Sequence, residues 1–325
     1  MTKPIAGISL DLDNQWSYMK TYGQPAWKEL PSYLDVVVPR VLEFFRCRDL
    51  KLTFFVVGWD AAQEKNHAAL RAIAEAGHEI GNHSYHHEPW LHRYSDEQLE
   101  FEIAETQQLV RRVTGAKCVG FRGPGFSVTP AVLGALVRHG YQYDASLFPT
   151  FIGPLARAYY FLGSRLDKEE RAARQQLFGT LCDGFQPLKP HWKQVPEGKI
   201  LEIPVTTMPV TRLPIHASYL LYLSQYSRPL ARTYFLAALA LCRVAGVRPS
   251  MLLHPLDFLG AEDRTGLDFF PAARMPLDRK LALMAQIIDC LANHYRLVPL
   301  CRYAQDLGPA PAAVEDETSM PCTRP

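Results

Sequence analysis

Short apolar runs alternate with amphipathic segments over the first half of the chain, and this alternation is the main restriction on its fold. The runs at 5–10 and 52–57 are apolar almost throughout, which is typical of strands buried on both faces of a sheet. Between them, apolar residues recur at helical spacing from Leu34 to Phe45. Strands joined by helices pair in parallel. The sequence therefore predicts an α/β fold around a parallel sheet.

The remaining elements follow from the same patterns. We expect strands at 5–13, 51–58, 78–83, 118–122, 141–144, 199–205, 249–255 and 295–300, and helices at 31–48, 66–76, 95–113, 129–139, 157–178, 218–226, 232–245 and 277–294. Ser95 with Gln98 three residues later fits a capping box at the start of a long helix.

The alternation stops between residues 150 and 199. We interpret this region as an insertion after the fifth strand, made of a helix at 157–178 and a loop that continues to Gly198. The sequence predicts a single domain over residues 1–307. Residues 308–325 are rich in proline, alanine and acidic residues and are expected to form a disordered tail.

Polar residues of types that can bind a metal or take part in catalysis stand where the predicted strands end. They are Asp11, Asp13, His83, Arg122, Asp144 and His254. Parallel strands end at one edge of the sheet, and α/β proteins place their chemistry at that edge. We therefore expect these side chains to gather in one site.

Asp11 and Asp13 end the first strand, and the alternation of side chains along a strand places both on the same side. Two carboxylates side by side are costly to bury unless a cation lies near them. The alternative is an acidic turn that caps the next helix. Because Leu10 and Leu12 continue the apolar alternation between the acids, a turn is the weaker interpretation.

His83 and His87 are four residues apart, a spacing that places two side chains on one face of a helical turn. Two converging imidazoles provide half of a zinc site, which needs a carboxylate and an open position in addition. The alternative is an ordinary surface segment, because five histidines lie between residues 78 and 92. Metal binding therefore depends on partners from elsewhere in the chain.

Charge and cysteine content exclude several classes of function. The formal net charge is only +2, so the chain lacks the basic surface that nucleic acids require. Seven cysteines are scattered without a C-x-x-C pair, which favours reduced thiols over a disulfide framework. The first strand begins within a few residues of Met1, leaving no room for a signal peptide, and no apolar run is long enough to span a bilayer. We expect a cytoplasmic protein.

Taken together and in this order, the motifs resemble the polysaccharide deacetylase family, the NodB-homology carbohydrate esterases of family 4 type. The resemblance covers roughly residues 5 to 305. It rests on the acids Asp11 and Asp13, the box from His83 to His87, Arg122-x-Pro124, the strand end at Asp144, and the sequence Leu252-Leu253-His254-Pro255. It implies a distorted, incomplete (β/α) barrel that binds one divalent metal, usually zinc.

The resemblance also implies a role for each residue. Asp13, His83 and His87 would be the metal ligands, with water completing the site. Asp11 would be the general base and Arg122 would hold it in place. His254 would protonate the leaving amine and Asp144 would orient it. The backbone N–H of Gly125 would stabilise the oxyanion, and Leu252 would line the acyl pocket.

Two departures from the family pattern leave alternatives open. The acids are usually adjacent, whereas Leu12 separates them here, so the roles of Asp11 and Asp13 could be exchanged or both could bind metal. Gly125 stands where an aromatic residue is usual, and Phe126 follows it as the candidate for substrate contact.

The expected activity is hydrolysis of an amide that removes an N-acyl group, acetyl in the first instance, from an amino sugar in a glycan or glycan precursor, with metal-bound water as the nucleophile. A lipid- or nucleotide-linked sugar fits a cytoplasmic enzyme, and contact with a membrane surface is part of this expectation. The alternatives are a cyclic amide hydrolase of the allantoin or hydantoin type, a non-catalytic glycan-binding module, and an iron oxygenase built on the same ligands. The intact set of Asp11, Arg122, Asp144 and His254 disfavours a mere binding module.

Overall fold

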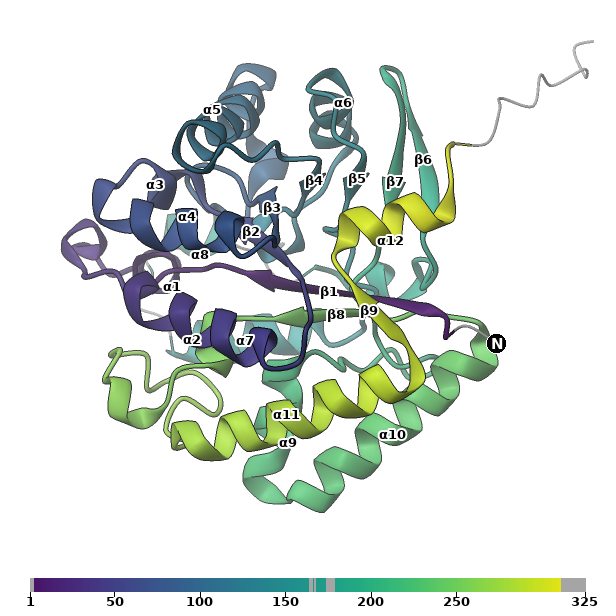
Figure 1. The fold of residues 1–325 in the computed structure, drawn as a ribbon. Coiled ribbons are helices and arrows are strands. Elements are labelled where there is room, and N and C mark those ends of the chain that lie inside the picture. The colour runs from purple at the N-terminus through teal and green to yellow at the C-terminus, as the bar shows by residue number, and fades with distance from the viewer. Residues whose placement is uncertain (1–2, 164–165, 167, 174–178, 311–325) are drawn as a thin grey trace, which may run out of the picture.

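A curled parallel sheet surrounded by helices forms the body of the molecule (Figure 1). The structure is a computed structural model, which describes residues 3–163, 166, 168–173 and 179–310. Within these residues the strands are β1 (Ile5–Asp11), β2 (Thr53–Val56), β3 (Glu79–Asn82), β4 (Gly120–Phe121), β5 (Tyr143–Asp144), β6 (His191–Val195), β7 (Gly198–Glu202), β8 (Ser250–Leu253) and β9 (Arg296–Val298). The expected α/β fold is confirmed.

The order of the strands is that of an incomplete barrel. It runs β6-β7-β5-β4-β3-β2-β1-β8, with β9 also paired to β1, and every pair except β6 with β7 is parallel. Past β7 the chain reaches toward the far edge of the sheet, because Thr206 donates its N–H to the carbonyl of Ser250 at 3.1 Å. The sheet therefore curls almost into a closed barrel.

The α-helices follow the predicted positions closely. They are α1 (Gln15–Thr21), α2 (Leu34–Arg46), α3 (Gly58–Ala61), α4 (His67–Glu75), α5 (Asp96–Thr114), α6 (Pro130–Arg138), α7 (Gly153–Gly163), α8 (Lys168–Ala173), α9 (Ala217–Tyr226), α10 (Arg228–Ala245), α11 (Leu277–His294) and α12 (Leu300–Leu307). The capping box of α5 is confirmed, since Ser95 and Gln98 exchange hydrogen bonds. The helices α1, α3 and α12 were not expected.

The prediction of a loop before Gly198 is wrong for residues 191–195. This segment is β6, which pairs antiparallel with β7 over five residue pairs. Its side chains are of mixed polarity because β6 is the edge strand, and this mixture hides the strand in the sequence. The predicted helix at 157–178 consists of α7 and α8, and its positions 164–165, 167 and 174–178 lie outside the described residues.

Two apolar layers stabilise the sheet on its two faces. The larger core packs the sheet against the surrounding helices and includes Ile8, Phe54 and Val41. The second core, inside the curl, joins Phe55 and Tyr143 to side chains of α12. The N-terminus of α12 faces the amino ends of the strands, because Leu300 donates its N–H to Thr53 Oγ1 at 2.7 Å. The opposite, carboxyl end of the sheet is left for chemistry.

Within the described residues, no helix combines the length and the apolar content that crossing a membrane requires. The six cysteines of this part of the chain are free thiols, and Cys322 lies outside it, within residues 311–325 of the predicted tail. Residues 308–310 are described and follow α12. The cytoplasmic location stays a prediction.

Candidate active site

The carboxyl end of the sheet brings the predicted residues together. Asp11 is the last residue of β1, and Leu10 of β1 is in register with Leu253 of β8. His254 therefore lies one step beyond Leu253, beside Asp11. Since registered residues of parallel strands point to the same face, both side chains leave toward the inside of the curl.

Three of these side chains form the candidate metal centre. Oδ1 of Asp13 lies 2.9 Å from Nε2 of His87 and 3.3 Å from Nε2 of His83. All three ligand atoms lie within 4.8 Å of one another, and this is the one such cluster of histidine, cysteine or acidic residues in the described part of the chain. The ligand set predicted for Asp13, His83 and His87 is therefore assembled.

A loop, and not the expected helical turn, brings the two histidines together. The chain leaves β3 at Asn82, and Ser84 and His87 both adopt positive φ, 60° and 53°. These left-handed residues fold the segment back on itself, so that His87 returns toward His83 with 5.0 Å between their ring centroids. The helical turn that the spacing of the histidines suggested is absent, although the convergence that it implied is correct.

Buried polar side chains hold this loop. Glu102 of α5 is 1% exposed and accepts hydrogen bonds from the backbone N–H groups of Tyr85 at 2.7 Å and His86 at 2.9 Å. The side chain of Asn82 accepts from Ser84 N at 2.8 Å. The hydrogen bonds to Glu102 and Asn82 therefore stabilise the strained, left-handed backbone of the loop that carries the ligands.

The three ligands fit a divalent transition metal. Nδ1 of His83 lies 2.6 Å from the carbonyl oxygen of Arg122, so Nδ1 carries the proton and Nε2 presents a lone pair to the site. Oδ1 of Asp13 is buried and accepts no hydrogen bond from the described residues, although two imidazoles surround it. A carboxylate oxygen and two imidazole nitrogens that converge in this way are typical zinc ligands.

The charges of the ligands agree with this geometry. Burial alone would raise the pKa of Asp13, but His87 and His83 hold it well below its usual range. Burial likewise opposes a charge on His83, yet Asp11 and Asp13 raise its pKa overall. The site is therefore built to concentrate negative charge next to two imidazoles.

Asp60 fixes the residues that follow Asp13. It is 1% exposed, and its Oδ1 accepts hydrogen bonds from Asn14 Nδ2 at 2.8 Å and from Trp16 Nε1 at 3.0 Å. Burial raises the pKa of Asp60 to about 7. The Trp16 ring lies 6.4 Å from the ring of His87, so the same contacts place an aromatic wall beside the ligand.

Arg122 makes the expected contact with Asp11. Its Nη1 lies 2.7 Å from Asp11 Oδ1 and 2.9 Å from Ser9 Oγ, and its Nε donates to the carbonyl of Ala145 at 2.8 Å. The guanidinium is fully buried and stacks over Phe55. Oδ2 of Asp11 remains directed toward His83, at 4.0 Å from Nε2. Arg122 thus fixes Asp11 beside the metal ligands.

The turn that follows Arg122 presents backbone at the same edge. Gly125 and Phe126 adopt left-handed φ of 59° and 65°. The N–H groups around Gly125 are used within the molecule, because Gly123 donates to Ser146 Oγ at 2.7 Å and Phe126 donates to the carbonyl of Gly123 at 3.0 Å. Gly125 N–H stays the predicted oxyanion donor.

His254 contacts a hydroxyl and an acid that the sequence did not point out. Ser218 Oγ lies 3.1 Å from His254 Nδ1 and donates to Asp257 Oδ1 at 2.7 Å, while Asp257 Oδ2 accepts from the backbone N–H of His254. Burial raises the pKa of Asp257 above its usual value. Because Ser218 donates to Asp257, it accepts from Nδ1–H, which leaves Nε2 as the reactive nitrogen of His254.

Asp144 belongs to a different buried network. Its Oδ1 accepts a hydrogen bond from Ser146 at 2.6 Å, and its Oδ2 accepts none from the described residues. Burial and the negative charge of Glu202 raise the pKa of Asp144 well above its usual range, and Lys193 pairs with Glu202 at 2.9 Å. In the structure the side chain that contacts His254 Nδ1 is that of Ser218, so an orienting role of Asp144 toward His254 stays a prediction.

The network around Asp144 supports the site through the backbone. Ser146 links Asp144 to the N–H of Gly123, and Glu202 Oε1 accepts from the N–H of Leu147 at 3.0 Å. These bonds hold the segment in which the carbonyl of Ala145 accepts a hydrogen bond from Arg122 Nε. A catalytic role of Asp144 stays a prediction, and the contacts favour a positioning role.

Leu252 lies in β8 in register with Ser9 of β1 and is 1% exposed. The two side chains share the face of the sheet that carries Asp11, so Leu252 lies inside the curl as an acyl-pocket residue would. Phe126 contacts Phe148 with 4.6 Å between ring centroids, and Phe148 lies 5.8 Å from the ring of His216. Aromatic rings therefore connect the Arg122 turn to the His254 side.

The hydrogen bonds that connect Asp257 through Ser218 to His254 form a relay. Ser218 provides a first test of this relay. We expect Ser218→Ala to lower kcat on an amide substrate by roughly ten- to a hundredfold, since a hydrogen bond to a charged group is worth about 1.5–3 kcal/mol. The alkaline limb of the pH–rate profile should move to lower pH, because the protonated imidazole loses its acceptor. Ser218→Thr keeps the hydroxyl and should restore both. An unchanged profile in the alanine variant would remove Ser218 from the relay.

Lys280 supports the loop that follows His254. It is 1% exposed, and its Nζ donates to the carbonyls of Leu256 at 2.7 Å and Leu259 at 2.6 Å. Burial lowers the pKa of Lys280 to about 8. The folded protein thus holds fewer protons than the unfolded chain between about pH 8 and the ordinary lysine value of 10.5.

The free energy of unfolding should consequently rise as pH increases through that window, by up to about 3 kcal/mol from this lysine. Lys280→Met lacks the titrating group and should lack this rise, although it is less stable at pH 7 because two carbonyls lose their donor. Urea unfolding of both proteins at pH 7 and pH 10 measures the difference. Parallel pH dependence in the two proteins would contradict the assignment.

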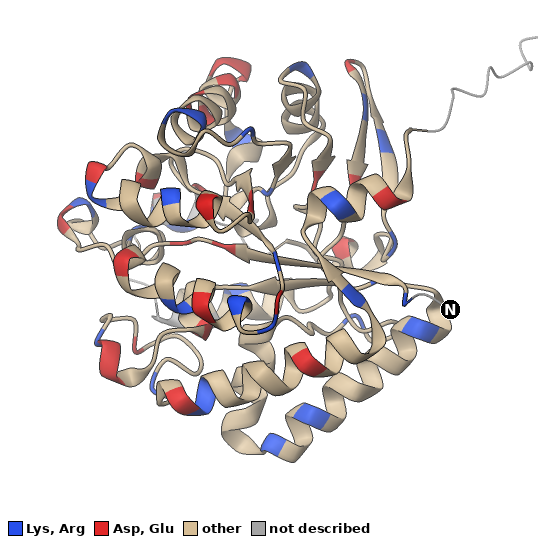
Figure 2. Ribbon diagram, viewed as in Figure 1, with Lys and Arg blue, Asp and Glu red and all other residues tan. Residues whose placement is uncertain are grey.

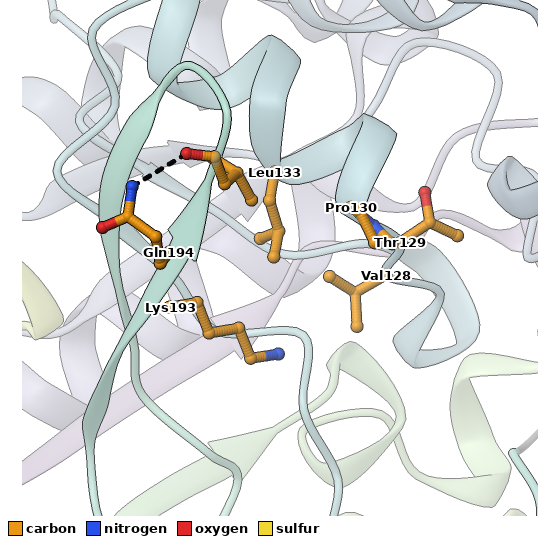
Figure 3. A pocket seen from close by; sticks show the side chains of 7 residues that line it. Val128, Thr129, Pro130, Leu133, Lys193 and Gln194 are labelled. Carbon is orange, nitrogen blue, oxygen red and sulfur yellow. Dashed lines mark hydrogen bonds between the residues drawn. The ribbon is translucent and has the colours of Figure 1, made fainter. Parts of the chain in front are cut away.

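The structure also contains a surface pocket of about 280 Å³ (Figure 3). It is lined by Val128, Thr129, Pro130, Leu133, Lys193, Gln194 and Val195, between the start of α6 and β6. None of the predicted site residues lines it. Its link to the site is Lys193, which pairs with the buried Glu202.

Residues 30–143 match the family model described as polysaccharide deacetylase, which includes His83, His87 and Arg122. Over these residues the chain is similar to the polysaccharide deacetylase family. It is 30% identical over 147 residues to the peptidoglycan deacetylase of Helicobacter pylori, covering 44% of this chain and 49% of that protein. It is 30% identical over 111 residues to the peptidoglycan-N-acetylmuramic acid deacetylase PdaA of Bacillus subtilis, covering 34% and 41%. The matches thus span half or less of these relatives.

Solved structures extend the likeness in fold to nearly the whole chain. A protein from Mycobacterium smegmatis assigned as a polysaccharide deacetylase covers 94% of both chains with a TM-score of 0.58 and 19% identity. PuuE allantoinase covers 92% of this chain and 89% of its own, with a TM-score of 0.50 and 17% identity. At these identities the likeness shows a shared fold.

Proposed function

We propose that this protein is a divalent-metal-dependent amide hydrolase that removes an N-acyl group, acetyl in the first instance, from an amino sugar of a glycan or glycan precursor. The observation that carries the proposal is the convergence of Asp13, His83 and His87 beside Asp11, with His254 on the adjacent strand end. The deacetylase names of the relatives support the same reaction.

Asp13, His83 and His87 would hold the metal. When bound there, a divalent cation would lower the pKa of a water molecule and polarise the acyl carbonyl. Asp11 accepts the proton of the attacking water through its Oδ2, while its Oδ1 stays bound to Arg122. The buried guanidinium keeps Asp11 in one orientation, so that the base is in place before substrate arrives.

The amine is a poor leaving group and departs only after protonation. His254 donates that proton from Nε2 to the amide nitrogen, because its Nδ1 is bound to Ser218. Asp257, through Ser218, stabilises the positive imidazole before the transfer. The products are a free carboxylic acid and the amino sugar, and the proton taken by Asp11 balances the proton given by His254.

The backbone and the apolar wall complete the proposed site. Gly125 N–H faces the developing oxyanion, and Leu252 contacts the methyl group of the acyl chain. The half-buried aromatic rings of Phe126 and Phe148, which contact each other beside the strand ends, offer flat faces to a sugar ring. A lipid- or nucleotide-linked sugar is the substrate class that we favour, in keeping with the predicted cytoplasmic location.

The direct test incubates metal-loaded protein with N-acetylated chitooligosaccharides, peptidoglycan fragments and lipid- or nucleotide-linked N-acetylated sugars, and measures released acetate. Release that requires metal supports the proposal. The cyclic amide alternative gives a different product, because ring opening adds one water and releases no separate acid, so product mass distinguishes the two. Binding of glycans without turnover of any of these amides would favour a binding module.

A further inference from the structure

Helices α9 and α10 form a hairpin whose outer surface is apolar. The chain turns at Ser227, and the large apolar side chains on both sides of the turn are exposed: Tyr226 by 71% and Leu230 by 53%. Farther along α10, Leu236 is exposed by 40% and Val244 by 88%. We call the surface formed by these four residues and Arg228, Arg232 and Arg243 the hairpin face.

The charges of this face have a single sign. Between Glu202 and Asp257 the chain carries five arginines and neither lysine nor an acidic residue, although the whole protein has a net charge of only +2. Figure 2 shows α10 with blue positions and no red one. The arginines at 228, 232 and 243 are exposed and form no ion pair with an acid in the described part of the chain.

The apolar and basic side chains are sorted on α10. At 100° per residue, Leu230, Leu236 and Val244 fall within a sector of about 120°, and the three arginines fall within an adjacent sector of about 60°. The side of α10 opposite the apolar sector is buried, with Phe235, Leu239 and Cys242 in contact with the body of the protein, and the arginine sector borders this buried side. An exposed apolar stripe with a basic border is typical of helices that lie on anionic bilayers.

The hairpin face is continuous with the active site. Ser218, near the start of α9, contacts His254. From there the rings of Tyr219, Tyr222 and Tyr226 follow α9 toward the turn, with centroids 6.5 Å and 5.3 Å apart. Ligands that rest on the hairpin face would thus lie at one end of an aromatic path whose other end is the proposed acid.

We propose that the hairpin face docks on a membrane surface that contains anionic lipid. A second copy of this chain is a weaker occupant, because a twofold contact would bring the arginines of both copies together without an acid to pair them. Delivery of a lipid-linked amino sugar to His254 along α9 rests on the proposed function, whereas the docking itself does not.

Sedimentation with lipid vesicles tests the docking. The wild-type protein should bind vesicles of phosphatidylcholine with phosphatidylglycerol, bind phosphatidylcholine alone more weakly, and dissociate as salt is raised. Arg228→Gln, Arg232→Gln and Arg243→Gln combined should reduce binding by on the order of tenfold or more, since each basic residue near an anionic surface contributes. The triple variant Leu230→Ser, Leu236→Ser, Val244→Ser, with its charge unchanged, should also bind more weakly.

Arg71→Gln, Arg111→Gln and Arg112→Gln form the matched control, because these exposed arginines lie on α4 and α5 and the loss of charge is equal. The control should bind like the wild type. Equal loss in both arginine variants, no binding to anionic vesicles, or a dimer that the serine variant abolishes would overturn the docking. Turnover of a water-soluble N-acetylated sugar should be the same in all variants, so a failure of docking is distinct from a failure of the proposed function.

Discussion

Asp11→Asn should lower kcat for amide hydrolysis by roughly a hundred- to ten-thousandfold, the range that a positioned general base contributes. Asparagine keeps the shape of the side chain and can still contact Arg122, but it cannot accept a proton from water. Because Asp13, His83 and His87 are unchanged, the variant should bind metal as the wild type does. Steady-state kinetics together with metal analysis of the same sample provide the measurement.

Two other results would have different meanings. If the variant loses metal, Asp11 is a ligand in addition to or in place of Asp13, which is the exchange of roles that the Asp11-Leu12-Asp13 spacing leaves open. If kcat stays within tenfold of the wild type and metal is retained, Asp11 is not the base. Asp49→Asn, an acid outside the site, serves as the control.

His254→Asn should produce a loss that depends on the leaving group. For an N-acetyl amide we expect a fall in kcat/KM of roughly a hundred- to ten-thousandfold, because the amine cannot depart without a proton. For an aryl acetate ester, whose phenolate leaves without protonation, the fall should be only several-fold. The ratio of the two effects measures the role of His254 as an acid, separately from any change in folding or metal binding.

His294→Asn is the matched control for this series, since His294 ends α11 away from the strand ends. An equal loss on amide and ester in His254→Asn would contradict the assignment, and would indicate that His254 acts on a step common to both substrates.

Local sequence patterns predicted most of the fold because they depend on neighbours in the chain. The spacing of apolar residues in 34–46 and 277–294 and the capping box at Ser95 concern residues a few positions apart, and α2, α11 and α5 agree with them. β6 could not be found in this way. An edge strand exposes one side to solvent, so its composition is that of a loop.

The sequence predicted that the site lies at the strand ends, but it did not predict the side chains that hold the site residues in place. Ser84 and His87 adopt left-handed backbone because Glu102, on another element, receives the N–H groups of the loop. The spacing of His83 and His87 suggested a helical turn at this position. Spacing along the chain carries no information about a partner on another element, so it could not indicate the contact with Glu102. Glu102 itself reads as one more acid on an amphipathic helix, and only its 1% exposure distinguishes it.

The partner of His254 could not be chosen from the sequence for a related reason. Asp144 and Asp257 both lie close to a strand end, and only the packing shows that Ser218 on α9 links His254 to Asp257, while Asp144 faces Glu202. A signal was present in the short spacing from His254 to Asp257, which allows the acid to accept the backbone N–H three residues earlier. Ser218 had no comparable signal.

The central claim is that one divalent ion is held by Asp13, His83 and His87, and metal analysis of purified variants tests it most directly. Protein loaded with zinc and freed of excess metal should carry one ion per chain in the wild type and in His92→Ala, a nearby histidine outside the cluster. His87→Ala should carry much less than one. A stoichiometric ion in His87→Ala, or none in the wild type, would contradict the account.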